Sequence, residues 1–255
     1  MTDNELTPLE LIENSKFMAQ VLTAYGSFFS RHFEAYAADP TINLDTYGTQ
    51  AEVRIKNLLL SSLDLYQYFK DLTLLSEYFH IDRRDISTTY KGKLSQEEYF
   101  SYHYENFVIR IVTSIDICAK IGNILYDLGI QDRFCNWHGF AYHKDMQGSA
   151  PASKLIDCAN YLSEFKAKRH AQLHWGKPAA NDYGYIVTFG DVDNESGKAH
   201  LPIEDRIDAL IEDQMGQIKV VLNKLGSHIV TVLDSMQEKL DKLVAELPSG
   251  DVSSP

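Results

Sequence analysis

Long stretches of this sequence place apolar residues three and four positions apart, and this spacing constrains the fold more than any other feature. It puts apolar side chains on one face of an α-helix. The longest stripe lies between residues 202 and 247 and comprises Ile218, Leu222, Leu225, Ile229, Val232, Met236, Leu240, Leu243 and Leu247. Because each stripe must be buried against another helix, the sequence predicts an all-α bundle of long antiparallel helices.

Capping and stop signals predict where the helices begin and end. Thr7 with Glu10 and Ser95 with Glu98 have the spacing of capping boxes, which open helices. The expected helices cover residues 8–37, 49–80, 96–129, 151–174 and 202–247. The Gly- and aromatic-rich stretch between the third and fourth helices is expected to be a connector with one short helix.

These boundaries predict how the chain is organised. The expected segments are an N-terminal helix and connector (1–48), a helical bundle (49–178), a loop or short hairpin (179–201), a long C-terminal helix (202–247) and a disordered tail (248–255). The run YGYIVTFG lies in the third of these segments, 179–201, and is the one place where β-structure is expected, as at most one short β-hairpin.

Charge and cysteine usage limit the possible partners. The chain has 24 Lys and Arg against 36 Asp and Glu, a formal net charge of −12, which opposes non-specific binding to nucleic acid or anionic membranes. Any RNA site must therefore be a local basic patch. Three cysteines, an odd number without close spacing, favour reduced thiols. With an acidic N-terminus and no apolar run long enough to span a membrane, we expect a cytoplasmic protein with no membrane partner.

One segment concentrates residue types used in catalysis. Residues 165–177, FKAKRHAQLHWGK, hold four of the 24 basic residues and two of the nine histidines. Within this segment Arg169 and His174 enclose four residues, and residues five apart on a helix lie about 140° apart around its axis. Either the helix ends between them, or they line a groove whose second wall is another copy of the chain.

The arrangement of Arg169 and His174 resembles the R-x4-6-H motif of the HEPN superfamily, the higher-eukaryote and prokaryote nucleotide-binding domains. The resemblance covers the motif and, more loosely, the helices of residues 49–175. It implies a metal-independent endoribonuclease in which these two residues are catalytic. It also implies an RNA substrate, a homodimer with paired motifs at a shared cleft, and an antitoxin or defence-operon protein partner in a bacterial toxin–antitoxin or phage-defence system.

The chemistry of RNA cleavage suits these two residue types. A histidine can transfer a proton to or from a ribose oxygen near neutral pH, and an arginine can stabilise the charged phosphorane. Residues expected to support the pair or bind RNA are Lys168, His170, Trp175 and Lys177 around the motif, and Arg110 and Asp116 on the third helix. Trp175 could stack on a base.

Other interpretations stay open. The basic segment could be a solvated helix C-terminus, where the helix dipole favours cations. Arg110 and Asp116 could form ordinary ion pairs. The chain could also be a non-catalytic HEPN-like module that binds a protein or nucleotide. No metal and no cofactor are expected, because Ala171 occupies the Glu position of the zinc motif that His170 and His174 would otherwise suggest, and no Walker A loop or dinucleotide fingerprint occurs.

Overall fold

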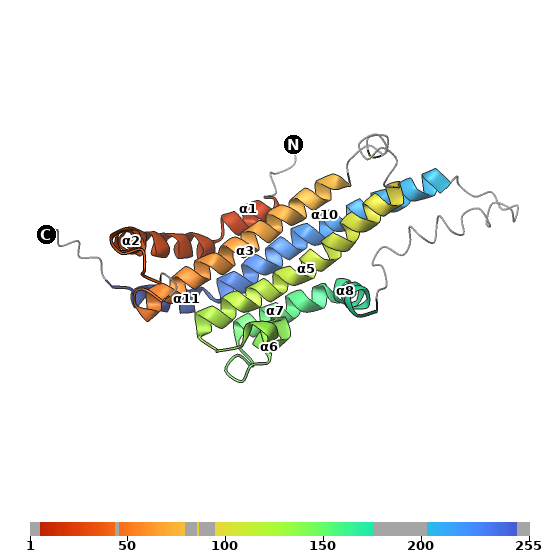
Figure 1. The fold of residues 1–255 in the computed structure, drawn as a ribbon. Helices are drawn as coiled ribbons and strands as arrows, with labels where there is room; N and C mark the ends of the chain where they lie inside the picture. The colour runs from red at the N-terminus through yellow and green to blue at the C-terminus, as the bar shows by residue number, and fades with distance from the viewer. Residues whose placement is uncertain (1–5, 44–45, 80–85, 87–94, 176–202, 249–255) are drawn as a thin grey trace, which may run out of the picture. The chain divides into compact units, whose positions relative to one another are not determined.

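The computed structural model describes residues 6–43, 46–79, 86, 95–175 and 203–248, without the side chains of residues 96–97, 172–175 and 203–204. All regular structure in these ranges is helical, and the all-α bundle is confirmed for this part of the chain (Figure 1). The expected hairpin and almost all of the expected tail lie outside the described residues.

Nine α-helices and one 3-10 turn make up the described structure. They are α1 (Pro8–Glu13), α2 (Lys16–Ala38), α3 (Gln50–Tyr78), α5 (Gln96–Tyr126), the 3-10 turn η1 (Asp132–Phe134), α6 (Trp137–Ala141), α7 (Ala150–Tyr161), α8 (Ser163–Trp175), α10 (Ile203–Ser235) and α11 (Gln237–Ala245). The capping box of Thr7 and Glu10 opens α1 as predicted. The short helix expected in the connector is α6. None of the described helices is both long enough and apolar enough to cross a membrane.

Three helices expected to be continuous are interrupted, so the predicted spans 8–37, 151–174 and 202–247 were wrong. Ser15 starts a new helix because its side chain accepts a hydrogen bond from the Met18 N–H at 3.2 Å. The other breaks fall at Leu162 and Met236, which are both fully buried. An apolar residue at a break keeps the helical spacing of the stripe intact, so the sequence pattern does not reveal it.

The described contacts divide the chain into two compact units. The first unit comprises residues 1–67, 114–160 and 225–255. Within it α2 packs against α11, and the α10 backbone approaches α1 so closely that a Cβ at Gly226 would lie 3.0 Å from the Pro8 Cα. The Phe140 ring of α6 occupies the space beside Gly122 of α5, where a Cβ would lie 2.4 Å from the ring. This unit therefore has its own closely packed core.

The second unit comprises residues 68–113 and 161–224. Its core includes Phe69, Phe100 and Phe107, none of which is more than 1% exposed. The Phe165 ring of α8 meets the Phe107 ring of α5 edge-on, with centroids 6.0 Å apart. Helices α3, α5 and α10 contribute residues to both units. The division expected from the sequence stays a prediction.

Candidate functional site

Helix α8 carries both residues of the expected catalytic pair. It runs without interruption from Ser163 to Trp175, so the helix does not end between Arg169 and His174. Of the two alternatives given by the sequence, a helix that ends between these residues is therefore excluded. Positions five apart on a continuous helix lie about 140° apart around its axis. Residues 169 and 174 therefore stand at different sides of the α8 backbone.

Lys168 connects α8 to α5. Its Nζ donates a hydrogen bond to Tyr104 Oη at 3.0 Å, pairs with Glu164 Oε1 at 2.9 Å, and lies 5.3 Å from the centre of the Tyr104 ring. Burial lowers the pKa of Lys168, but its hydrogen bonds to Tyr104 and Glu164 outweigh burial and leave the pKa above its ordinary value. The ammonium thus stays charged and is already engaged by protein groups.

The remaining residues of the segment have different surroundings. Arg169 is half-buried and His170 is exposed. The side chains of His174 and Trp175, and all of Lys177, lie outside the described residues. The distance between the members of the expected pair is therefore not given by the structure, and their catalytic role stays a prediction.

Arg110 and Asp116 have contacts of the kind expected for ordinary structural residues. Arg110 Nη1 donates to Asp71 Oδ2 of α3 at 2.7 Å, and its guanidinium lies 5.5 Å from the centre of the Tyr68 ring. Asp116 belongs to the first unit, where its Oδ1 accepts a hydrogen bond from the backbone N–H of Trp137 at 3.1 Å. Asp116 and the α8 motif therefore belong to different compact units.

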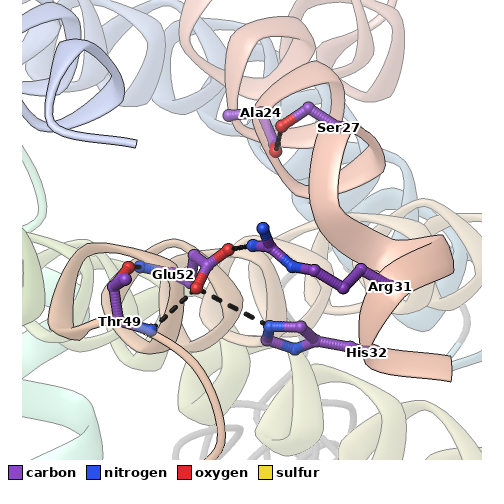
Figure 2. Close-up of polar contacts among 6 residues, drawn as sticks. All are labelled: Ala24, Ser27, Arg31, His32, Thr49 and Glu52. Carbon is purple, nitrogen blue, oxygen red and sulfur yellow. Dashed lines mark hydrogen bonds and ion pairs between the residues drawn. The ribbon is translucent and has the colours of Figure 1, made fainter. Parts of the chain in front are cut away.

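A second polar cluster, which the sequence analysis did not identify, lies where the chain passes from α2 to α3 (Figure 2). Its centre is Glu52, whose side chain is only 2% exposed. Glu52 Oε2 accepts a hydrogen bond from the Thr49 N–H at 2.7 Å, and Thr49 Oγ1 accepts one from the Glu52 N–H at 3.3 Å. These two bonds form a capping box at the start of α3. The guanidinium of Arg31, which is about half exposed, pairs with Glu52 Oε1.

His32 completes this cluster. Its Nε2 lies 3.8 Å from Glu52 Oε2, and its ring contacts those of Phe28 and Tyr47, with centroids 4.9 and 5.0 Å away. Burial, and then the positive charges of Arg31 and Lys56, lower the pKa of His32 below its ordinary 6.5. The imidazole is therefore neutral at neutral pH. The nearby hydrogen bond from Ser27 Oγ to the Ala24 carbonyl, 2.6 Å long, stays within α2.

Gly48 makes the close approach of these groups possible. Its φ is +101°, and a Cβ there would lie 2.7 Å from Glu52 Oε2 and 2.8 Å from His32 Nε2. The cluster has a carboxylate, an imidazole and a guanidinium, but both carboxylate oxygens are occupied by contacts that fix the α2–α3 connection. We therefore assign it a structural role. The T-x-x-E spacing of Thr49 and Glu52 is the sequence signal that could have revealed it.

The described residues contain no group of three or more His, Cys, Asp or Glu side chains that could hold a metal ion. Comparison with known proteins found no relative: the chain matches no family model, no curated protein and no solved structure.

Proposed function

We propose that this chain is a metal-independent endoribonuclease of the HEPN type, with Arg169 and His174 as its catalytic residues. The observation that carries the proposal is the composition of α8. Its last turns are rich in cationic residues and contain the R-x4-H spacing, although the chain as a whole has a net charge of −12. Such a patch is what an acidic protein needs to attract an RNA phosphate.

The reaction would use the substrate's own 2′-hydroxyl as the nucleophile. The 2′ oxygen forms a bond to phosphorus as its proton leaves, and the bond from phosphorus to the 5′ oxygen breaks as that oxygen gains a proton. His174 suits proton transfer at one of these oxygens, and the Arg169 guanidinium suits the charge on the phosphorane. The products are a 2′,3′-cyclic phosphate and a 5′-hydroxyl, and DNA is not a substrate.

The continuity of α8 adds a condition to this proposal. Because residues 169 and 174 occupy positions about 140° apart around one helix, we propose that Arg169 of one chain acts with His174 of the partner subunit. In a dimer of an Arg169→Ala chain with a His174→Ala chain, one of the two sites keeps both groups. Two inactive variants should therefore regain cleavage when they are mixed.

Cleavage of a single-stranded RNA in the presence of EDTA tests the proposal. Arg169→Ala and His174→Ala should each lower the rate by roughly 10²-fold or more. Arg133→Ala and His138→Ala are matched controls, because both residues are exposed and lie in the first unit. Full cleavage by the His174→Ala protein would overturn the assignment. Cleavage that stops in EDTA would point instead to a metal-dependent nuclease.

A non-catalytic HEPN-like module is the second candidate, and a specific observation favours it. Lys168 and Arg110, two cations expected to support RNA binding, are engaged by Glu164 and Asp71. A chain that cleaves no RNA but binds a protein or nucleotide, with unchanged binding in the Arg169→Ala variant, would establish this alternative.

A further inference from the structure

Helix α2 exposes an unusual number of large apolar side chains. Leu22, Phe29, Phe33 and Tyr36 are 53%, 46%, 60% and 42% exposed, and Tyr25 is half-buried. At 100° per residue these five side chains fall within about 80° around the helix axis. The Phe29 ring lies 5.5 Å from that of Tyr25 and 6.2 Å from that of Phe33, measured between centroids. They form one continuous ridge, which we call the α2 ridge.

A row of small residues runs beside the α2 ridge. Its members, all exposed, are Ala19, Thr23, Gly26, Ser30 and Ala37. Gly26 is informative because glycine in a helix interior is less stable than alanine, and a Cβ at this position would meet nothing within 4 Å. The part of the chain that the structure describes therefore gives no reason for this glycine, whereas close approach of another helix does.

The spacing of the ridge indicates which helix would approach. Relative to Phe29, the other ridge residues stand seven and four positions before it and four and seven positions after it. A two-fold axis at Phe29 would therefore place Leu22 opposite the partner's Tyr36, and Tyr25 opposite the partner's Phe33. A two-fold interface must be self-complementary in this way. The ridge of each helix then packs along the ridge of the other, and the two small-residue rows lie side by side, which lets the helices approach closely.

Charge also favours a second copy. Two chains of net charge −12 repel each other, and this repulsion is weakest where they meet through a surface without charged side chains. Helix α2 has no Lys, Arg, Asp or Glu between Lys16 and Arg31, and Arg31 is directed to Glu52. The exposed Glu34 lies about 140° around the helix axis from the centre of the ridge. The α2 ridge is thus a face on which two such acidic chains can meet without bringing like charges together.

We propose that the α2 ridge is the contact surface of a homodimer in which two copies of α2 pack antiparallel across a two-fold axis at Phe29. The five side chains expose roughly 100 Å² each, so two copies would bury about 1,000 Å² of ridge surface. Stable interfaces bury roughly 1,200–2,000 Å² in total, and the small-residue row brings the contact near the lower end of this range. We therefore expect a dissociation constant on the order of micromolar. This inference involves no residue of α8 and does not depend on the proposed nuclease.

Sedimentation over a range of protein concentrations tests the dimer. Phe29→Arg and Phe29→Glu should each weaken it by at least tenfold, because each places two like charges on the axis. Mixing the two variants should restore it through the opposite charges. Leu60→Arg is the control, since Leu60 is also exposed, at 52%, in the same unit but on α3. Helical circular dichroism confirms that each variant is folded.

Cross-linking with a short bismaleimide tests the antiparallel register in a Cys135→Ser background. Phe29→Cys should cross-link to itself, whereas Leu22→Cys should cross-link to Tyr36→Cys and not to itself. Self-cross-linking of Leu22→Cys would mean a parallel pair and would refute the proposed axis. A monomer at every concentration, or a dimer that Phe29→Arg leaves unchanged, would overturn the proposal altogether.

Discussion

Substituting Gly48 by alanine offers the sharpest test of the buried cluster at the start of α3. A positive φ is unfavourable for any residue with a Cβ, by about 1–2 kcal/mol. At Gly48 the new methyl group would also lie 2.7 Å from Glu52 Oε2 and 2.8 Å from His32 Nε2. Neither group can easily move away, because Glu52 is held by Thr49 and Arg31 and the His32 ring is packed against two aromatic rings.

The expected loss of stability follows from these two effects. Overpacking of this kind costs roughly 1–3 kcal/mol. The backbone strain adds to this cost. Alanine also lowers the conformational entropy of the unfolded chain, which stabilises the folded state by about 0.4–1 kcal/mol. Taken together, Gly48→Ala should lower the free energy of unfolding by about 2–4 kcal/mol. For a chain of this size that corresponds to a fall in Tm of roughly 5–15 °C.

Alanine substitutions at two other glycines distinguish backbone strain from overpacking when urea unfolding is followed by circular dichroism. Gly129 has φ +68° but nothing within 4 Å of a Cβ, so Gly129→Ala should show the strain alone. Gly216, inside α10, also has open space and no positive φ, so Gly216→Ala should be neutral or stabilise by up to about 1 kcal/mol. If Gly48→Ala cost no more than Gly129→Ala, the Glu52 cluster would not be the rigid connection described here.

Three further outcomes follow from the pKa shifts and hydrogen bonds. The pKa of His32 is lowered in the folded state, so the unfolded chain binds more protons than the folded chain as the pH falls below about 6.5, and the free energy of unfolding falls with the pH. His32→Gln should therefore flatten the dependence of the unfolding free energy on pH between about 7 and 5. Burial raises the pKa of Cys135 to about 11, two units above the ordinary value, so iodoacetamide should modify it about 100-fold more slowly than an exposed thiol at pH 8, and the fully buried Cys118 more slowly still. Tyr104→Phe removes the hydrogen bond to Lys168 and should destabilise the fold by about 0.5–1.5 kcal/mol in the same urea assay.

The long helices could be predicted because burial repeats along them. Ile111, Ile115 and Cys118, for example, are all completely buried and stand at helical spacing. The interruptions could not be predicted from this signal, because Leu162 and Met236 fit the apolar stripe whether or not the helix continues. Ser15 is different: its capping role depends on a local choice of backbone conformation that a serine in a helical pattern leaves open.

Polar contacts between residues far apart in the sequence were the hardest feature to predict from the sequence. Arg110 and Asp71 are 39 positions apart, and only the packing of α5 on α3 brings their side chains to 2.7 Å. The Glu52 cluster depends both on a local sequence motif and on a contact with a residue far away in the sequence. The capping box of Thr49 and Glu52 has a recognisable spacing, whereas the presence of His32 beside it depends on how the chain turns at Gly48.

The continuity of α8 changes what the catalytic pair requires. A break between Arg169 and His174 would have allowed one chain to bring both to one phosphate, but the helix continues through both positions, and we therefore propose that a second copy completes the site. The α2 ridge supplies an independent reason to expect a second copy. The Phe29→Arg protein, with an intact α8, connects the two proposals. If it is monomeric and no longer cleaves RNA, the α2 dimer also assembles the cleft. If it is monomeric and still cleaves, Arg169 and His174 act within one chain, and the mixed-variant experiment should then show no recovery.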